Sequence, residues 1–274
     1  MTTTGISERV RASMGLRREQ STIGVYASFA QRFARFTKKE QGFTEDDALA
    51  FIDDLISKGY SDSSIRWSLY ALRRTYKAVG CTLTVGLEDL PLGRRGAIHR
   101  PILSADEVAG LIAFTRRCGS LAERLYLAMS TVYGLRRVEL SRLSEESFRE
   151  GTVRIDTAKH GAPRTHLIPS EIQAVVEEAL RADALGYSIS GLTAMFRELH
   201  RRAGLKRDGA LGWHSIRRSL DTQLLDAGLN YYSVRDFLRW RSAPGDMPAL
   251  YHRSNPQDVD AAVFAVHPFV SYWR

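Results

Sequence analysis

The chain contains little cysteine, no long apolar run and none of the short motifs that bind nucleotides or metals. Its 274 residues include two cysteines, Cys81 and Cys118, which lie far apart and have no Cys-x-x-Cys or Cys/His ligand spacing. Neither a disulfide framework nor a zinc site is indicated, so a reducing cytoplasm is the expected compartment. No uncharged apolar segment is long enough to predict a membrane span or a secretion signal. A Walker A loop and an acidic metal cluster are also missing, so we expect no ATP, no metal ion and no other cofactor.

What the chain has in excess is positive charge. It carries 39 Lys and Arg against 31 Asp and Glu, a net charge of +8. This balance favours a polyanionic partner such as nucleic acid, although it would also suit many unrelated proteins. With 44% hydrophobic residues, a chain of this length can bury a substantial core and is expected to form about two domains.

The first part of the chain has the periodicity of three or four helices and no convincing strand. Between Ile23 and Phe36, apolar residues recur at three- and four-residue steps, as on one face of an amphipathic helix. A second helix is expected after Thr44, a good N-cap that is followed by three acidic residues, and a third begins around Ser61. We therefore predict a helical domain over residues 1–90.

A basic linker and a second domain follow. Residues 91–100 mix proline, glycine and arginine without periodicity, which is typical of an interdomain linker. The second domain, over residues 101–274, is mostly helical, but residues 152–156 and 164–169 alternate like the two strands of a β-hairpin. The predicted fold class is therefore mainly α, with a helical N-terminal domain and an α+β second domain that contains a small antiparallel sheet.

Several residues of the second domain are suited to phosphoryl transfer. In chain order they are Arg136, His214, Arg217, Trp240 and Tyr251. Two arginines can each donate two hydrogen bonds to the non-bridging oxygens of a phosphate as charge builds up in the transition state. A tyrosine hydroxyl, with a reference pKa of about 10, needs a base or a strong positive field before it attacks, and a histidine beside two arginines can supply both. The tryptophan indole can donate to phosphate but cannot act as a base.

A lysine completes the set, and other residues compete for some of these roles. Lys159, on the predicted hairpin, is a suitable general acid for the leaving oxygen. Taken alone, an arginine or lysine in such a place is usually a solvated charge, and the histidine and tryptophan are usually capping or core residues. The alternatives by residue type are Arg137 for the first arginine, Tyr231 or Tyr232 for the nucleophile, and Lys206 for the lysine.

The motifs around these residues resemble the tyrosine recombinase (phage integrase) family. Residues 100–260 are similar to its catalytic domain, and residues 15–85 are similar to its helical core-binding domain. The family pattern is an arginine in a Gly-Leu-Arg-x-x-Glu-Leu turn, a hairpin lysine, a His-x-x-Arg box, a His or Trp, and a late tyrosine. The resemblance assigns the six catalytic roles to Arg136, Lys159, His214, Arg217, Trp240 and Tyr251. It implies site-specific DNA breakage and rejoining through a phosphotyrosine joined to the DNA 3′ end, without ATP.

Two positions depart from the family pattern. Arg218 stands where the His-x-x-Arg box usually continues with a second histidine, and Arg239 stands where a glycine usually precedes the His or Trp. Tryptophan at position 240 occurs within the family, so the chemistry is expected to survive, in a divergent branch. The substitution at Arg239 and an insertion-like loop over residues 244–248 are the features that leave the local geometry open.

The resemblance also implies partners. Duplex DNA would be clamped between the two domains, and four protomers would assemble on two DNA sites and exchange strands through a Holliday junction. Residues expected to contact phosphates are Lys38, Lys39, Arg66, Arg73, Arg74, Arg94 and Arg95. The apolar segment 259–266 is expected either to dock on a neighbouring protomer or to close the core of its own chain.

Two rival functions use the same fold. A type IB topoisomerase would relax supercoils with the same residues and would not require paired sites. A catalytically silent DNA-binding regulator would bind DNA normally and form no covalent adduct. The complete set of six residues argues against the silent protein.

Overall fold

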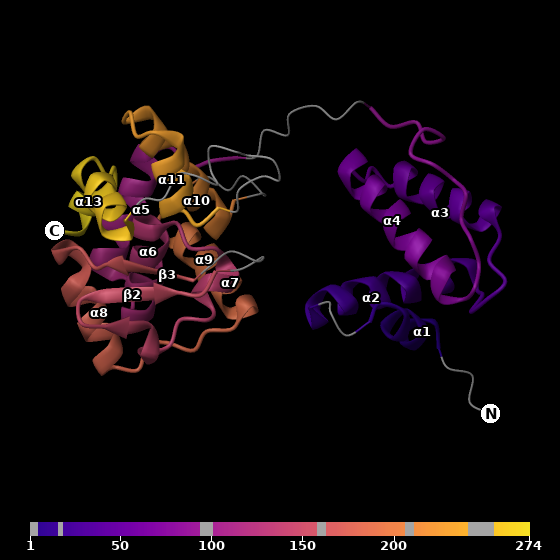
Figure 1. Ribbon diagram of the computed structural model, residues 1–274, viewed down its shortest axis with the longest axis horizontal. Coiled ribbons are helices and arrows are strands. Elements are labelled where there is room, and N and C mark those ends of the chain that lie inside the picture. Colours follow the sequence, from indigo (N-terminus) through magenta and orange to yellow (C-terminus); the bar gives the residue numbers. More distant parts are fainter. Residues whose placement is uncertain (1–4, 16–18, 94–100, 158–162, 206–210, 241–254) are drawn as a thin grey trace. The chain divides into compact units, whose positions relative to one another are not determined.

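The computed structural model describes residues 5–15, 19–93, 101–157, 163–205, 211–240 and 255–274 (Figure 1). The chain divides into two compact units, Met1–Ile98 (unit 1) and His99–Arg274 (unit 2). Both are mostly helical, and unit 2 contains one small antiparallel sheet, so the predicted fold class is confirmed. In the described part of the chain, no helix has both the length and the apolar character that crossing a membrane requires.

Unit 1 is a helical bundle around an aromatic core. Its helices are α1 (Ile6–Ser13), α2 (Gln20–Thr37), α3 (Glu45–Ser57) and α4 (Asp62–Ala78). The predicted cap at Thr44 is confirmed, because its hydroxyl accepts from the Asp47 N–H while the Asp47 carboxylate accepts from the Thr44 N–H. Phe33 packs against Phe51 and Tyr76 with ring centroids 5.3 and 5.9 Å apart, which ties α2 to α3 and α4. Helix α1 was not predicted.

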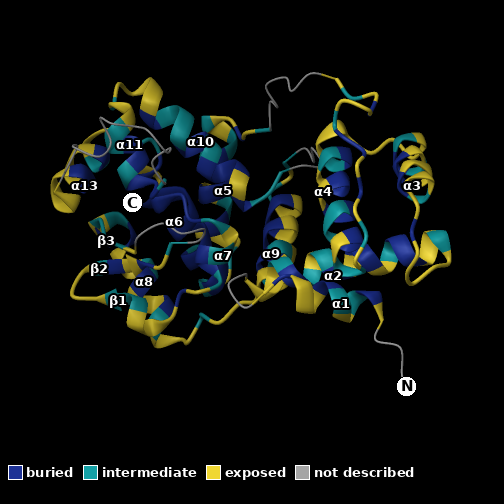
Figure 2. Cartoon of the chain, turned by 45° about the vertical axis from the view of Figure 1, so that its right-hand side comes forward, coloured by how far each residue is buried: buried dark blue, intermediate teal, exposed yellow. Residues whose placement is uncertain are grey.

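The helices of unit 2 surround α6, whose side chains are almost all buried (Figure 2). In chain order they are α5 (Ala105–Cys118), α6 (Leu121–Tyr133), α7 (Arg137–Leu140), α8 (Ser170–Arg181), α9 (Ile189–Arg202), α10 (Trp213–Asp226), α11 (Tyr231–Phe237) and α13 (Pro256–Ala265), with 3-10 turns η1 (Glu145–Ser147) and η2 (Val270–Trp273). Because α6 contacts α5, α7, α8 and α10, residues at its C-terminal end lie where several elements meet.

The sheet of unit 2 has the strand order β1-β2-β3. Its strands are β1 (Phe148–Arg149), β2 (Thr152–Ile155) and β3 (Arg164–Leu167), each antiparallel to its neighbour. The predicted hairpin is therefore confirmed, and β1 adds a short third strand. In this register Val153 pairs with His166, and both side chains are buried.

Helix α13 closes the core of its own chain in this structure. Val259 and Val263 are buried in the core of unit 2, and α13 packs against α11 and β3. This arrangement is the second of the two that the sequence left open for segment 259–266. The helix also brings a buried carboxylate, that of Asp260, against the sheet.

Candidate active site

The first arginine of the site lies at a tight turn between α6 and α7. Gly134 ends α6 with a positive φ of 59°, and a side chain there would meet Leu238 at 2.8 Å, so the position favours glycine. Arg136 then caps α7: its N–H donates to Oε2 of Glu139 (2.8 Å) and its Nη1 donates to Oε1 (2.6 Å). One carboxylate therefore fixes both the backbone and the guanidinium of Arg136.

The second arginine and the histidine come from the first turns of α10. His214 is the second residue of this helix and is exposed, whereas Arg217, three residues later, is 5% exposed. Residues three apart lie on the same side of a helix. Trp213 anchors the start of α10 by donating from its indole N–H to the Leu192 carbonyl (2.6 Å). The helix thus presents His214 and Arg217 together at the positive end of its dipole.

Arg217 is held from two sides by backbone carbonyls. Its guanidinium donates to the carbonyls of Gly134 and Leu238, and Nη1 lies 4.0 Å from Oε2 of Glu139. Burial, and then the positive charges of Arg239 and Arg136, hold the pKa of Arg217 well below its usual value. These charges disfavour another cation and favour an anion at this point.

Glu139 is the carboxylate on which the arginines converge. Its side chain is fully buried, and Arg136, Arg217 and Arg239 all lie within 4.0 Å of it. Burial by itself raises the pKa of Glu139, but the charges of Arg239 and Arg136 and the N–H of Arg136 outweigh burial and lower the pKa. The carboxylate is therefore ionised at neutral pH and partly balances the arginine cluster.

Arg239, where the family pattern has glycine, is part of this cluster. It follows α11 with φ of 56°, a left-handed conformation that glycine adopts most readily. Its guanidinium is buried and lies 3.4 Å from Oε2 of Glu139 and 2.9 Å from Nε2 of His166. Arginine in place of glycine therefore retains the left-handed backbone turn and places a cation in the interior.

The other departure, Arg218, has a structural contact. Its guanidinium donates to the Pro101 carbonyl, with Nη2 at 2.6 Å, and to Oγ of Ser215 at 3.0 Å. Next to it, Ser219 donates to the Leu103 carbonyl and accepts from the Leu103 N–H. Helix α10 is thereby attached to the segment where unit 2 begins.

Comparison with known proteins shows the family to which the chain belongs. The family model described as "Phage integrase family" matches residues 101–257, which is more than half of the chain. The chain belongs to the phage integrase family. This membership places it in the activity class of tyrosine-type DNA recombinases. A curated relative, tyrosine recombinase XerA of Pyrococcus furiosus, is 27% identical over 243 residues, which cover 81% of this chain and 80% of the relative.

Solved structures share the integrase fold. A λ integrase tetramer bound to a Holliday junction superposes with a TM-score of 0.69 at 16% identity, covering 90% of this chain and 76% of that one. The XerH recombinase in a post-cleavage complex with a palindromic difH substrate gives 0.63 at 14% identity, covering 86% and 88%. At these identities the likeness shows the fold of this integrase-family chain and no more.

Of the remaining predicted catalytic residues, the structure describes only Trp240. Trp240 directly follows the buried Arg239, is half-buried against the core and lies 6.1 Å from the Tyr231 ring, centroid to centroid. Arg137, the alternative to Arg136, is exposed and donates to Oγ1 of Thr193 instead. Lys159 and Tyr251 lie outside the described residues, as do Lys206, Arg94 and Arg95.

The basic residues predicted to contact DNA from unit 1 have varied surroundings. Lys39 forms an ion pair with Asp47 (2.7 Å), Arg66 donates to the Gly93 carbonyl, and Arg73 donates to the Val85 carbonyl (2.8 Å). Lys38 is exposed, and Arg74 is half-buried. DNA contact by these five residues stays a prediction.

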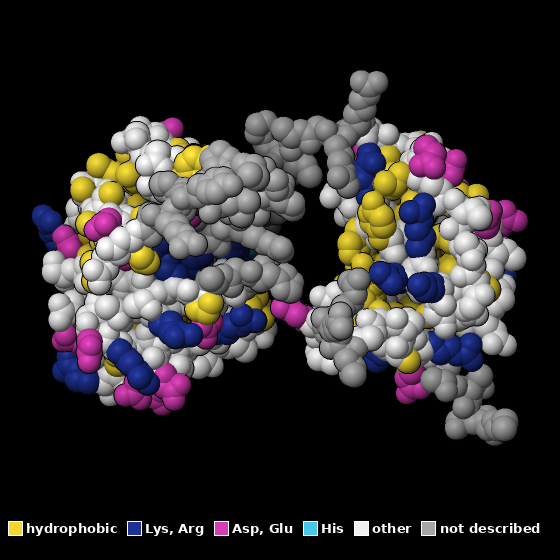
Figure 3. Space-filling model, viewed as in Figure 1, with side chains coloured by type: hydrophobic (Ala, Val, Ile, Leu, Met, Phe, Trp, Pro, Cys, Tyr) yellow, Lys and Arg dark blue, Asp and Glu magenta, His cyan; other side chains and the backbone are white. Residues whose placement is uncertain are grey.

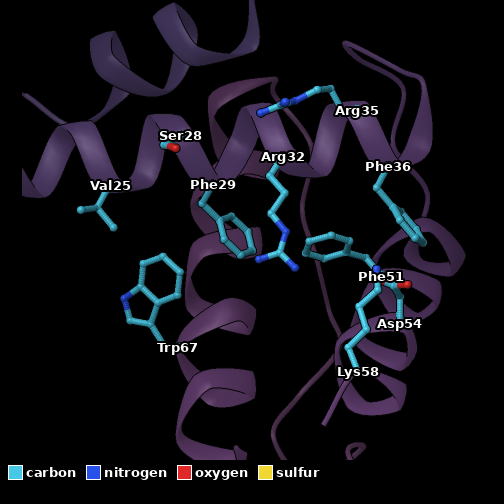
Figure 4. Close-up of a pocket in the computed structure, with 10 residues that line it drawn as sticks. All are labelled: Val25, Ser28, Phe29, Arg32, Arg35, Phe36, Phe51, Asp54, Lys58 and Trp67. Atoms are coloured by element: carbon cyan, nitrogen blue, oxygen red, sulfur yellow. The ribbon is translucent and has the colours of Figure 1, made fainter. Parts of the chain in front are cut away.

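A basic and aromatic groove lies on unit 1 and was not singled out as a site from the sequence. It has a volume of about 650 Å³, and in Figure 4 the side chain of Arg32 lies between the rings of Phe29 and Phe51. Figure 3 shows basic and hydrophobic side chains mixed on one face of this unit. Its lining residues are Val25, Ser28, Phe29, Arg32, Arg35, Phe36, Phe51, Asp54, Lys58 and Trp67. The groove combines cations with flat apolar surface, as nucleic-acid-binding surfaces do.

Proposed function

We propose that this protein is a site-specific DNA recombinase that breaks and rejoins DNA through a covalent 3′-phosphotyrosyl intermediate. The observation that carries the proposal is the convergence of Arg136 and Arg217 on one buried carboxylate. His214 stands in the first turn of α10, the helix that also carries Arg217. Two guanidiniums fixed in this way are preorganised for the non-bridging oxygens of a scissile phosphate. Family membership supports the same reaction.

In the proposed reaction, Tyr251 is the nucleophile. Its phenolic oxygen forms a bond to phosphorus while the bond from phosphorus to the 5′ oxygen breaks. The phenolic proton passes to His214, and Lys159 protonates the departing 5′ oxygen. A 5′ hydroxyl then reverses these steps and releases the tyrosine. The phosphotyrosine retains the energy of the phosphodiester bond, so the cycle requires no ATP.

The described residues supply charge and position in this scheme. The pentacoordinate transition state has more negative charge on its non-bridging oxygens than the ground state, so Arg136 and Arg217 stabilise it selectively. The dipole of α10 acts in the same direction. Trp240, which follows the buried Arg239, would donate its indole N–H to the phosphate or pack against the nucleophile.

Duplex DNA is the proposed partner, with four protomers on two sites during strand exchange. The solved λ integrase tetramer on a Holliday junction has the same fold, and we extend that assembly to this chain. In unit 1, the groove around Arg32 and Arg35 is a proposed contact to the DNA backbone, together with the predicted lysines and arginines of that unit. Phosphate neutralisation would supply much of the affinity.

A plasmid assay separates this function from its rivals. A supercoiled plasmid would carry two copies of the DNA that flanks the protein's own gene, and a matched plasmid would carry one copy. The proposal predicts recombinant circles from the two-copy plasmid and none from the one-copy plasmid. Relaxation of both plasmids without recombinants would indicate a topoisomerase, and binding without any change of topology would indicate the silent regulator.

A further inference from the structure

Arg239 has a left-handed backbone conformation, which glycine adopts most readily. Helix α11 ends in a left-handed turn in which the Trp240 N–H donates to the Arg235 carbonyl (2.9 Å) and the Arg239 N–H donates to the Asp236 carbonyl (3.1 Å). Arg239 has φ of 56° there, a conformation that disfavours every residue with a side chain. The contacts of the arginine side chain must therefore offset this unfavourable backbone conformation.

The Arg239 side chain is built into the interior of unit 2. It is 1% exposed, and its guanidinium donates to the carbonyls of Tyr133 and Phe237, both at 3.0 Å. Burying a cation is unfavourable unless a carboxylate lies close to it. Glu139 supplies that charge, with its Oε2 3.4 Å from Nη2 of Arg239. Since the side chain is enclosed by protein, it does not reach a DNA phosphate itself.

The same carboxylate holds the two arginines of the active site. Oε1 of Glu139 accepts from Nη1 of Arg136 at 2.6 Å, and Oε2 accepts from the Arg136 N–H at 2.8 Å. Oε2 also faces Arg239 at 3.4 Å and Arg217 at 4.0 Å. A carboxylate has two oxygens and four lone-pair directions, so donors on one side restrict how it presents itself to donors on the other. Arg239 is therefore positioned to set the orientation in which Glu139 meets Arg136 and Arg217.

Arg239 also contacts a histidine of strand β3. Its Nη1 lies 2.9 Å from Nε2 of His166, and because a guanidinium nitrogen only donates, this Nε2 accepts. Nδ1 of His166 then carries the proton and donates to Asp260 at 2.9 Å. Asp260 also accepts from Nη2 of Arg164 and from the Leu167 N–H, both at 2.9 Å. The contacts run continuously from α7, through Arg239 and β3, to α13.

We propose that Arg239 is a positioning residue for the cleavage reaction, because it orients Glu139 and thereby the guanidiniums of Arg136 and Arg217. The proposal rests on the function proposed above and adds to it a residue that does not touch the DNA. Loss of Arg239 would leave the scissile phosphate bound but its non-bridging oxygens imperfectly stabilised, and misplacement by about 1 Å can slow a reaction by about 100-fold.

The test compares two scissile linkages in single-turnover cleavage. The substrates are a duplex that the wild-type full chain cleaves and the same duplex with an uncharged methylphosphonate at the scissile position. The variants are Arg239→Gly, which suits the left-handed backbone, and Arg239→Lys, which retains the buried charge but lacks the planar fork. The control is Arg202→Lys, which alters an arginine paired with Glu123 elsewhere in unit 2 (3.0 Å).

The expected result is a loss of charge-dependent catalysis at unchanged DNA affinity. Both Arg239 variants should cleave the phosphodiester about 10- to 100-fold more slowly than wild type, with DNA dissociation constants within about 3-fold. On the methylphosphonate, where one negative charge is missing, their deficit should shrink to about 3-fold or less. Arg202→Lys should behave as wild type on both substrates.

Two results would overturn the proposal. One is an Arg239→Lys or Arg239→Gly enzyme that cleaves the phosphodiester at the wild-type rate. The other is an equal deficit on both substrates, which is the outcome of a merely structural role. Failure of the wild-type enzyme to cleave any duplex would instead contradict the proposed function, so the two failures are distinguishable.

Discussion

Nη1 of Arg136 lies 2.6 Å from Oε1 of Glu139, and the N–H of the same arginine lies 2.8 Å from Oε2. This buried carboxylate also faces Arg239 and Arg217. Removing its charge leaves cations buried without compensation, which typically costs about 3–5 kcal/mol. We therefore expect Glu139→Gln to lower the free energy of unfolding of unit 2 by several kcal/mol, measured by urea denaturation.

The matched control for that variant is Glu171→Gln. Glu171 is paired with Arg274 at 2.8 Å, but the Arg274 side chain is 75% exposed. Exposed ion pairs contribute about 0–1 kcal/mol, so this change should alter stability little. Equal losses for the two variants would refute a central role for Glu139 in holding the arginine cluster.

Arg136→Lys and Arg137→Lys should have very different effects on catalysis. Arg136 is fixed at the arginine cluster, whereas Arg137 is exposed and bonded to Thr193. Lysine cannot reproduce the planar fork of a guanidinium, and loss of one preorganised donor typically slows a reaction by about 100- to 1,000-fold. We expect that loss in single-turnover cleavage for Arg136→Lys and a near wild-type rate for Arg137→Lys. A larger defect for Arg137→Lys would show that the assignment is wrong.

Unit 2 should lose stability as the pH falls from about 6.5 towards 4. Burial is the main cause that lowers the pKa of His166 and of His267 from 6.5 to about 4. Between these values the unfolded chain binds a proton at each histidine and the folded chain does not. For each unit by which the pH falls in this window, each histidine therefore lowers the free energy of unfolding by about 1.4 kcal/mol. Above pH 6.5 neither histidine makes the free energy of unfolding depend on pH. Below about pH 4 both are protonated in the folded and the unfolded chain, so the loss of stability stops growing.

Urea denaturation at several pH values checks this slope. Three of the four tryptophans lie in unit 2, so a Trp67→Phe background makes the fluorescence report on that unit. His267 donates from Nε2 to the Val132 carbonyl (2.9 Å), and His267→Gln removes its titration. The variant should reduce the histidine contribution to the slope by about half. An unchanged slope would contradict the pKa assignment of His267.

The groove of unit 1 should contribute to the salt dependence of DNA affinity, because its arginines are proposed to contact phosphates. Each phosphate contact contributes about −0.9 to the slope of log affinity against log salt concentration. If Arg32 and Arg35 both contact phosphates, Arg32→Ala/Arg35→Ala should weaken binding and make the slope less steep by about 2. Arg201→Ala, which removes an exposed cation of α9 paired with Glu198, is the control. A slope equal to that of wild type would exclude the groove as a phosphate contact.

The sequence predicted the helical elements and the hairpin because their signals are local. The stripe from Ile23 to Phe36, the cap at Thr44 and the alternation in residues 152–156 each extend over a few neighbouring residues, and each corresponds to an element of the structure. Helix α1 has only 8 residues, too few for a clear apolar period, and was therefore missed.

The arrangement around the arginines could be predicted only in part. The resemblance indicated Arg136, His214 and Arg217, and the structure brings both arginines to Glu139. The contacts of Arg239 with His166 and of His166 with Asp260 join residues 73 and 94 positions apart, and Asp260 stands in an apolar segment. No local pattern marks such pairs. The one available signal was an arginine where the family pattern has glycine.

The basic residues of unit 1 show that charge alone does not identify which side chains are available to contact DNA. Lys39, Arg66 and Arg73 were proposed from charge alone, and each has an intramolecular partner that charge counting does not indicate. Conversely, the groove around Arg32 forms only when α2, α3 and α4 pack together, because its lining comes from all three helices.

The most direct test of the central claim is detection of the covalent DNA adduct. Labelled duplexes from the regions flanking the protein's own gene, including nicked suicide substrates, would be incubated with wild type and with Tyr251→Phe, then separated on a denaturing gel. We predict an SDS-resistant, protease-sensitive adduct with wild type and none with Tyr251→Phe. DNA that is bound under native conditions but never forms an adduct, even when nicked, would contradict the recombinase mechanism.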